Sequence, residues 1–525
     1  VTNRGNGAGL VTGSGFVTRG ATFTATATPA AGYRFWRWEG AIGDNDPTSP
    51  TLTLVSDFAR TVTAVFSRDW HVDGVTGDDG NPGTSTAPFK TIHQALAVAD
   101  DGDTVYVAPA TYGFDPDHQA LVITNAIALV GTGANRTDVK VSYKASTENW
   151  TGFGGKRLLY VDNKDAKVQH IDFAGPDNKY NRSGNIDGST AYINAGLLSD
   201  CVFRDAFVDI AAGCGVYLNT EDAVAEDSLF SGFGSVNGYD KGGVALTIVN
   251  GLARRCEIIN NNGRQNGPVG LSGAKARLFD SIITNNQSCA AHKHTETTWG
   301  GPRSGGGVWI RNAGAVVSNC VIAANRTNLP QGGLKTVCTG GGIVFAAAGS
   351  VYNTVIRDNY AYLEGGGVYG VGNLYNCLIA DNESEAGQGG AVSGAARLYN
   401  CTVVGNDSQL TDGTDGISGD ATLLNCIVWN NGAKNYDTAA MTYSCSSPKP
   451  TGEGNRDSDP QFRSSLSRGL YCIASDSPCA KAGVWQDWMP GLKYLNGVPM
   501  PSEPGDVPMG CYAPYQIRGL IMEVR

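Results

Sequence analysis

The sequence predicts an all-β fold of the parallel β-helix class, in which short strands stack coil upon coil. Three observations predict it: a six-residue unit recurs seven times, glycine pairs precede many of the units, and the composition is rich in glycine and poor in charge. Each unit begins with a small residue and ends with an asparagine five places later, whereas successive units are 23 to 39 residues apart. A constant unit with connectors of variable length is typical of stacked coils.

Each unit predicts a short buried strand followed by a turn, because its small residue and the aliphatic residue two places later share one face. Coils stacked about 4.8 Å apart would align the asparagines at a turn. There the side-chain amides can bond to one another, and asparagine is a residue type that tolerates a left-handed backbone conformation. The small residues would align inside, where cysteine behaves as a small apolar side chain. The two predicted columns are Asn261, Asn286, Asn325, Asn359, Asn382, Asn406 and Asn431, and Cys256, Cys320, Cys377, Cys401 and Cys426.

A second signal precedes the units by ten to thirteen residues: two glycines followed by an aliphatic strand start. Such a pair fits a tight corner that leads into another strand of the same coil. The pairs lie at 242–243, 306–307, 341–342, 366–367 and 389–390. Together the two signals resemble the repeats of polymorphic outer-membrane proteins, with their Gly-Gly-Ala-Ile-like and Phe-x-x-Asn-like elements. Ile or Val replaces Phe here, for example at Ile322 and Ile356, so the resemblance implies the broader β-helix group.

Composition narrows the functional classes. Among the 525 residues, 17% are charged and 71 are glycine, which suits a turn-dense β protein and argues against disorder. The net charge of −10 gives no support for binding nucleic acid or anionic membranes. No apolar run approaches the roughly 20 residues needed to span a bilayer. The chain begins at Val1, as a processed secreted protein would, and its 13 cysteines are odd in number, so at least one cannot pair within the chain.

Residues 1–67 predict a small β-rich domain. Polar and apolar residues alternate over 22–28, and further short strands are expected near 33–38, 52–54 and 62–66. The segment from Ala27 to Gly40, closing on Phe66, resembles the divergent internalin-type B-repeat of bacterial surface proteins, which implies a spacer or a ligand-binding stalk. Its aromatic residues Phe35, Trp36 and Trp38 are expected to pack in a core, with a glycan-binding platform as the alternative.

Residues 68–440 are assigned to the β-helix. Apolar residues at Ile92, Ala95, Leu96 and Ala99 predict one amphipathic helix near 91–99, which would cover the open edge of the first coil. This stretch is similar to the start of many bacterial right-handed parallel β-helix proteins related loosely to pectate lyases, and the resemblance implies a right-handed solenoid.

Residues 441–525 are assigned to a C-terminal cap segment that resembles the C-terminal signature of surface-anchored β-helix proteins. Four cysteines there are candidate disulfide partners, with the pairing left open: Cys445, Cys472, Cys479 and Cys511. The apolar tail 517–525 is expected to form a strand that covers the last coil or pairs with a neighbouring molecule.

The connectors are where chemistry is expected, and the longest runs from Asn286 to Gly305. The predicted binding residues are His292, His294, Glu296, Trp299 and Arg303 of this connector, joined by Trp150 and Tyr180 from two other insertions as surfaces for sugar rings. A metal site formed by the two histidines and the glutamate is an alternative to a solvated polar loop. Cys289 could bridge to Cys338. No cofactor is expected; calcium would be the candidate ion, although no motif specifies it.

The leading hypothesis is a secreted or cell-surface structural or adhesive protein that presents its connectors to polysaccharides or partner proteins. It would bind no nucleic acid and could assemble into filaments through its termini. The alternative is a carbohydrate-active enzyme, either a polysaccharide lyase or a glycosidase, acting around 292–303. Asp358 and Asp381 share one offset in adjacent coils, but the next coils have Gly405 and Asn430 there, which favours a role in the turn. No catalytic residue is assigned.

Overall fold

The computed structural model describes residues 2–4, 8–13, 17–114, 120–143, 157–175, 188–208, 215–235, 243–263, 267–288, 305–328, 338–465 and 469–515. The chain forms two compact units. Unit 1 comprises Val1–Lys144, Leu158–Phe173 and Asn194–Val202, and unit 2 comprises Ala145–Arg157, Ala174–Ile193 and Phe203–Arg525. Strands β13 (Asp172–Ala174), β14 (Ala191–Ser199) and β15 (Val202–Arg204) include residues of both units.

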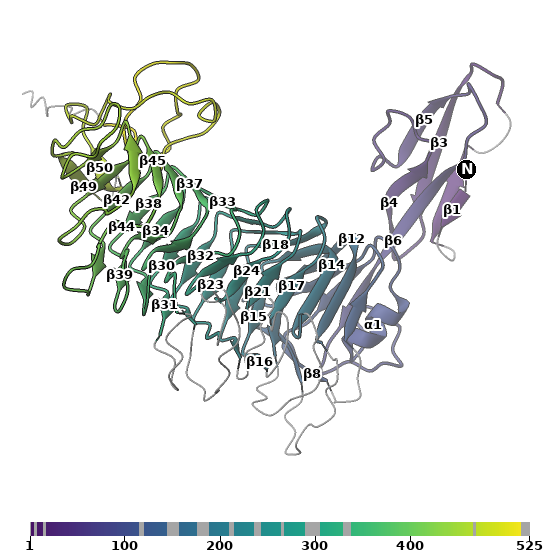
Figure 1. The fold of residues 1–525 in the computed structure, drawn as a ribbon. Helices are drawn as coiled ribbons and strands as arrows, with labels where there is room; N and C mark the ends of the chain where they lie inside the picture. Colours follow the sequence, from purple (N-terminus) through teal and green to yellow (C-terminus); the bar gives the residue numbers. More distant parts are fainter. Residues whose placement is uncertain are drawn as a thin grey trace, which may run out of the picture. The chain divides into compact units, whose positions relative to one another are not determined.

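Unit 1 begins with a β-rich module built of two small sheets (Figure 1). Strands β2 (Gly9–Thr12), β3 (Thr22–Pro29) and β5 (Thr51–Val55) form an antiparallel sheet. Strand β4 (Tyr33–Gly40) pairs antiparallel with β6 (Val62–Val72), and β1 (Thr2–Arg4) pairs parallel with β6. The core of the module contains Trp38, which is 2% exposed, with Phe35 packed against it. Trp36 is not part of this core; its ring packs against Gly102, and the Arg37 guanidinium lies 4.0 Å from the ring centre.

The module and the first coil share strand β6. Its residues up to Arg68 pair with β4, and Asp69–Val72 pair with β7 (Thr104–Val107). The boundary predicted at residue 67 therefore falls inside a strand instead of a linker. Arg34 adds a second connection, since it forms an ion pair with Asp69 and donates hydrogen bonds to Gly102 O and Thr104 Oγ1.

The predicted helix near 91–99 is α1 (Ile92–Val98), which packs on β6, β7 and β9 with Ile92 and Ala95 buried. Thr91 caps its first turn by accepting the Gln94 N–H on its hydroxyl. The remaining strands of unit 1 are β8 (Ala110–Phe114), β9 (Leu121–Ile123), β10 (Ala128–Gly131), β11 (Val139–Tyr143) and β12 (Leu159–Gln169), all in parallel pairings. In the described part of the chain, no helix has the length and apolar character of a membrane span.

Unit 2 is a stack of parallel coils whose strands align in rows (Figure 1). Row 1 contains β17 (Val216–Leu218), β21 (Leu246–Ile248), β24 (Val269–Leu271), β28 (Val308–Ile310), β32 (Ile343–Phe345), β36 (Val368–Gly370), β40 (Val392–Ser393) and β44 (Ile417–Ser418). Each strand pairs in register with the next, as Val308 does with Ile343.

Row 2 follows row 1 within each coil. Its strands are β18 (Ala223–Glu226), β22 (Leu252–Arg254), β25 (Arg277–Phe279), β29 (Val316–Ser318), β33 (Ser350–Tyr352), β37 (Asn373–Tyr375), β41 (Arg397–Tyr399), β45 (Thr422–Leu424) and β47 (Ala440–Thr442). Tyrosines stack in register on three of these strands, with Tyr352, Tyr375 and Tyr399 at ring distances of 4.7 Å.

Row 3 carries the six-residue units found in the sequence. Its strands are β19 (Leu229–Ser231), β23 (Glu257–Ile259), β26 (Ile282–Thr284), β30 (Val321–Ala323), β34 (Val355–Arg357), β38 (Leu378–Ala380), β42 (Thr402–Val404), β46 (Ile427–Trp429) and β48 (Cys445–Ser446). The rows thus extend to Ser446, and the boundary predicted at residue 440 lies inside β47.

A short row 4 closes several coils. It comprises β27 (Gln287–Ser288), β31 (Arg326–Thr327), β35 (Tyr360–Ala361), β39 (Glu383–Ser384) and β43 (Asp407–Ser408), and a separate two-stranded pair joins β16 (Phe207–Val208) to β20 (Gly234–Ser235). Aliphatic side chains of rows 1–3 fill the interior with exposures near 0%. The predicted fold class, an all-β right-handed parallel β-helix with a small β-rich N-terminal domain, is confirmed.

The segment after the last coil lies against the side of the stack. We call residues 469–515 the strap; it begins with β50 (Gly469–Ile473), which pairs antiparallel with β49 (Phe462–Ser465). Three asparagines that precede the small residue of a unit donate their amides to strap carbonyls: Asn376 to Lys493 O, Asn400 to Pro508 O and Asn425 to Val484 O, at 2.7 to 3.1 Å. Trp488 of the strap packs edge-on against the stacked Tyr375 and Tyr399. The tail 517–525 lies outside the described residues.

Candidate functional site

The unit asparagines form one hydrogen-bonded column inside the turn between rows 3 and 4. Each Oδ1 accepts both the main-chain N–H and an Nδ2–H of the preceding asparagine, as Asn359 does from Asn325 at 3.0 Å. Each Nδ2 also donates to a carbonyl of the preceding coil, for example Asn325 to Ile283 O at 2.9 Å. The column runs from Asn261 to Asn431 and ends on Asn435 Oδ1.

The left-handed backbone at this turn belongs to the residue before each asparagine, not to the asparagine itself. Positive φ values occur at Asn260, Asn285, Ala324, Asp358, Asp381, Gly405 and Asn430. The expectation that the column asparagines adopt this geometry is therefore wrong by one residue. The asparagines keep ordinary backbone angles because their side chains must point inward to bond to the next coil.

The unit cysteines form the interior column and are structural. The Sγ of Cys401 accepts the Cys377 N–H at 3.5 Å and donates to carbonyls of Leu374 and Tyr399. Burial raises the pKa of Cys256 and Cys320 to about 12, so these thiols are protonated at neutral pH. Serine and threonine occupy the same column in other coils. Their hydroxyl oxygens accept the equivalent main-chain N–H, as Ser281 Oγ does from Cys256.

The residues predicted to bind ligand lie outside the described part of the chain. This applies to His292, His294, Glu296, Trp299 and Arg303, to Trp150 and Tyr180 of the other insertions, and to Cys289. Cys338 is described and fully buried.

The row 1 positions that alternate with the core residues form a continuous line that we call the outer track: Tyr192, Tyr217, Thr247, Gly270, Trp309, Val344 and Tyr369. Thr247 and Val344 of this line are themselves buried, at 2% and 0% exposure. Neighbouring residues such as Val308 and Ile310 face the core at 0% exposure, so the alternation of a strand directs the track outward. The rings of Tyr192 and Tyr217 stack at 5.1 Å, with the Arg157 guanidinium over Tyr192.

Trp309 is the chemically most informative residue of the outer track. It is only 7% exposed, and its indole Nε1–H has no acceptor among the described residues. A buried donor without an acceptor costs about 1–3 kcal/mol, so the oxygen of a water molecule or of a ligand would be a favourable partner for it. The Arg311 guanidinium lies 4.4 Å from the centre of the Trp309 ring, and desolvation lowers the pKa of this arginine.

Between Tyr217 and Trp309 the outer track carries only Thr247 and Gly270. Three steps between coils separate the two aromatic residues, or about 14 Å along the stack. This stretch has two aromatic residues at its ends, small residues between them, one N–H donor and one cation. Chemically, it can stack the apolar faces of sugar rings, donate to a hydroxyl and attract a carboxylate.

Asp381 and Asp358, the two stacked carboxylates, lie on the outside of the row 3 turn. Asp358 forms an ion pair with Arg357, and the Tyr471 hydroxyl of the strap donates to Asp381 at 2.8 Å. Desolvation raises the pKa of Asp381, the Tyr471 hydrogen bond opposes the rise, and nearby Asp358 adds to it. These contacts fit the turn role expected from the sequence.

We predict that Asp381→Asn raises the melting temperature at pH 7. A raised carboxyl pKa means that the folded chain holds this proton more tightly than the unfolded chain, so the ionised group weakens the fold as pH rises. Asparagine accepts the Tyr471 bond without the charge and suits the positive φ at this position. Thermal unfolding at several pH values checks this: the gain should disappear below about pH 4, where the aspartate is protonated in both states. A gain of equal size at acidic pH would contradict the explanation.

Unit 1 contains a histidine that sequence reasoning missed. His170 Nδ1 lies 2.6 Å from Asp200 Oδ2, and its Nε2 lies 3.2 Å from the Gly133 carbonyl oxygen. Both residues have positive φ at equivalent turns. Because protein groups occupy both ring nitrogens, this pair holds two turns together and offers no open position to a substrate. Across the described ranges, no cluster of three or more His, Cys, Asp or Glu side chains is arranged to hold a metal ion.

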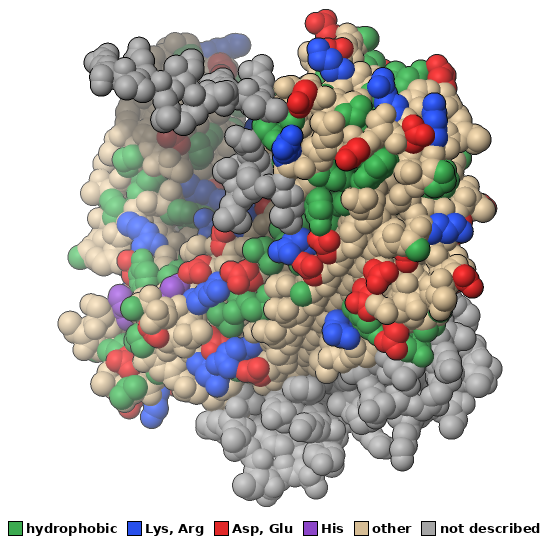
Figure 2. All heavy atoms as spheres, turned by 90° about the vertical axis from the view of Figure 1, so that its left-hand side faces the viewer, with side chains coloured by type: hydrophobic (Ala, Val, Ile, Leu, Met, Phe, Trp, Pro, Cys, Tyr) green, Lys and Arg blue, Asp and Glu red, His purple; other side chains and the backbone are tan. Residues whose placement is uncertain are grey.

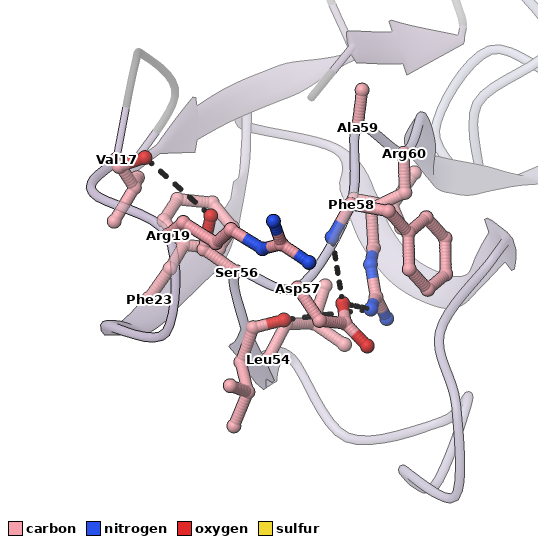
Figure 3. A pocket seen from close by; sticks show the side chains of 11 residues that line it. Val17, Arg19, Phe23, Leu54, Ser56, Asp57, Phe58, Ala59 and Arg60 are labelled. Carbon is pink, nitrogen blue, oxygen red and sulfur yellow. Dashed lines mark hydrogen bonds and ion pairs between the residues drawn. The ribbon is translucent and has the colours of Figure 1, made fainter.

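The N-terminal module contains a pocket of about 470 Å³ between the β3 and β5 sheet and the loop that follows β5 (Figure 3). Phe23 and Leu54 supply apolar walls, and Phe58 stands at the rim with 60% exposure. Figure 3 shows Arg60 bound to Asp57, so these two charges compensate each other. The pocket can accept a small apolar group.

Figure 2 shows a face of the molecule on which Lys and Arg side chains are interspersed with Asp and Glu. The described atoms of this face form no continuous basic patch. This distribution agrees with the net charge of −10, and it gives nucleic acid no extended basic surface on this face.

Comparisons with known proteins identify two sequence regions. Residues 1–69 match the divergent InlB B-repeat domain, and residues 75–149 match a protein family of unknown function, DUF1565. No curated protein matches the chain by sequence.

Several solved structures have a similar overall course of the chain. The complex of XylC with xylose is 11% identical, with a TM-score of 0.36, 75% of this chain covered and 87% of the other. Pectate lyase Pel9A is 13% identical, with a TM-score of 0.34 and coverages of 85% and 96%. Pectin methylesterase PemA from Erwinia chrysanthemi is 12% identical, with a TM-score of 0.30 and coverages of 49% and 80%. Likeness at this level carries no argument about activity. The comparisons therefore show a chain that begins with a region similar to the divergent InlB B-repeat and continues directly into one similar to DUF1565.

Proposed function

We propose that this chain is a secreted or cell-surface adhesive β-helix protein that binds acidic polysaccharide along the outer track. The observation that carries the proposal is the buried Trp309 indole N–H without an acceptor, beside the Arg311 guanidinium 4.4 Å from the centre of the indole ring. The match of residues 1–69 to a B-repeat supports a surface location, with the module serving as a spacer.

The chemistry of the outer track favours a uronate-containing polymer over a neutral one. A sugar hydroxyl or carboxylate oxygen can accept the Trp309 N–H, which removes the cost of leaving that donor buried and unbonded. The Arg311 guanidinium beside the Trp309 ring supplies a positive charge with several N–H donors, which suits a carboxylate. Tyr217, three coils from Trp309 on the outer track, supplies a second ring for stacking.

The connector predicted to bind ligand is compatible with this location. Residue 303, at its end, lies five positions before Val308, the first residue of β28, and β28 carries Trp309. His292 and Arg303 are therefore proposed to contribute to the same binding surface. This part of the proposal rests on position in the sequence alone.

We predict that Trp309→Phe weakens binding to polygalacturonate and alginate about five- to tenfold, because the ring stays while the N–H is lost. Arg311→Gln should remove the preference for these polymers over neutral dextran. Isothermal titration calorimetry of the three polymers against each variant measures both effects.

The matched control is Arg397→Gln, which removes an exposed arginine from β41, outside the outer track, and should leave binding unchanged. Wild-type protein that binds none of the polymers, or equal binding by all variants, would overturn the proposal. If wild-type protein shortens the acidic polymers and Arg311→Gln does not, the enzyme alternative replaces the adhesive one.

A further inference from the structure

Four buried cysteines outside the interior column fall into two separate groups. Cys445 in β48 and Cys479 in the strap are both 0% exposed and share one apolar cluster with Ile473 and Met509. Their side chains are close enough to be hydrogen-bonded to each other. The main chain holds Cys479 in place, because its carbonyl accepts the Met509 N–H at 3.0 Å.

Cys472 and Cys511 form the second group. Both are buried, at 1% and 0% exposure, in a different cluster that includes Leu378 and Val404 of row 3. Cys511 is fixed from both sides: its N–H donates to Thr402 Oγ1 at 3.2 Å, and its carbonyl accepts the Leu495 N–H at 3.0 Å. Cys472 lies in β50, opposite Arg463.

We propose that under oxidising conditions the chain forms two disulfide bonds, Cys445–Cys479 and Cys472–Cys511. Four cysteines allow three pairings, and the two clusters select one of them. In each bond two thiols lose two protons and two electrons. The oxidant is a small disulfide such as oxidised glutathione, which is reduced to two thiols in the exchange.

The interior column cysteines are excluded from these bonds by their geometry. Cys377, Cys401 and Cys426 occupy equivalent positions of successive coils, so their side chains point in the same direction and not toward one another. Each sulfur also donates to main-chain carbonyls at 3.3 to 3.7 Å, which fixes its rotamer. Their thiols should stay reduced when the strap cysteines oxidise.

One bond would fasten the strap to the coils, and the other would join the two ends of the strap. Cys445 belongs to the last strand of row 3, so its bond to Cys479 ties the strap to the end of the stack. The second bond joins the beginning of the strap to its end near Thr402. Both bonds close loops of more than 30 residues, for which the entropic stabilisation of a cross-link is large. This inference does not depend on polysaccharide binding.

Peptide mapping of the full chain tests the pairing directly. The protein is incubated in a buffer of oxidised and reduced glutathione, alkylated and digested without reduction. Trypsin alone leaves Cys472 and Cys479 in one peptide, 469–481, so a second protease that cleaves before Asp476 is needed to separate them. The expected result is two linked peptide pairs, 445 with 479 and 472 with 511, that vanish after reduction. Any other pairing of these four, or complete alkylation of all four, would overturn the proposal.

Variants separate the two bonds. Cys445→Ser and Cys479→Ser should each remove the same linked pair and keep the Cys472–Cys511 pair. Cys426→Ser is the matched control, because serine already occupies the interior column at Ser228, Ser281 and Ser444, and it should keep both pairs. Reduction of the wild-type protein should also lower its melting temperature, and a melting temperature unchanged by reduction would contradict the fastening role. The wild-type map decides the pairing even if a variant fails to fold.

Discussion

Gly366→Ala is expected to destabilise the β-helix by about 3 kcal/mol, near the upper end of the cost of overpacking a core. A Cβ at this position would lie 2.4 Å from both the Glu383 and the Gly390 carbonyl oxygens. Both are backbone atoms of the next coil, so no side chain can rotate away. Relief would require the two coils to separate, which would lengthen the hydrogen bonds between their strands.

The matched control is Gly367→Ala, one residue further along. The register of Val368 with Val392 makes Gly367 equivalent to Ala391, so the next coil already accommodates a Cβ at this position. A Cβ at Gly367 would lie 2.7 Å from the Ala391 carbonyl oxygen, a less close approach than at Gly366, so we expect a smaller cost of about 1–2 kcal/mol for Gly367→Ala. Neither glycine has a positive φ, so left-handed strain does not distinguish them. Urea unfolding of the two variants and the wild type measures the difference, and equal midpoints for the two variants would contradict the stacking explanation.

These glycines show how far the sequence pattern could be interpreted. The pairs do precede row 1 strands, as expected, but the glycine with positive φ is the one before the pair at Gly340 and Gly365, and the first glycine of the pair at Gly389. The pair itself is required by close approach between coils: a Cβ at Gly341 would lie 2.3 Å from Gly366 O, as in the coil that follows. The pattern located the corner, whereas the reason for the pair depends on atoms of another coil.

The columns of row 3 were predictable because a coil repeats the same small set of contacts. A constant offset between the small residue and the asparagine can persist through connectors of variable length only if both positions contact their equivalents in the next coil. The structure places Asn261 to Asn431 and Cys256 to Cys426 in this way. The strap could not be predicted, because its contacts with Asn376, Asn400 and Asn425 join residues 59 to 117 positions apart without any repeat.

The outer track was missed for a different reason. In Val308-Trp-Ile-Arg311, apolar and large polar or aromatic residues alternate, which indicates a strand with one buried face. That alternation could have identified Trp309 and Arg311 as outward neighbours. Sequence reasoning instead favoured the longer connector before them, because polar insertions in a solenoid commonly carry function. The distance between Arg311 and the Trp309 ring and the missing acceptor for the indole N–H required coordinates.

Asn261→Ala is expected to destabilise the fold by about 2–4 kcal/mol, because it leaves several buried polar groups without partners. Asn261 is 1% exposed; its Oδ1 accepts the Phe233 N–H at 3.0 Å, and its Nδ2 donates to Phe230 O and Asn286 Oδ1. Alanine removes all three bonds and puts no polar group in their place. The Phe233 amide is buried as well, so water does not readily replace the lost acceptor.

Asn262→Ala is the natural comparison, since Asn262 is adjacent in sequence, exposed and outside the column. Its replacement should change the free energy of unfolding by no more than about 0.5 kcal/mol. Urea midpoints report the global effect, and amide hydrogen exchange at Phe233 and Asn286 reports the local one. If both variants shift the midpoint equally, the amide column contributes little to stability and interior packing alone holds the coils. If only Asn261→Ala loses protection at Phe233, the column fixes the turn between rows 3 and 4, and every coil that carries the asparagine gains the same constraint.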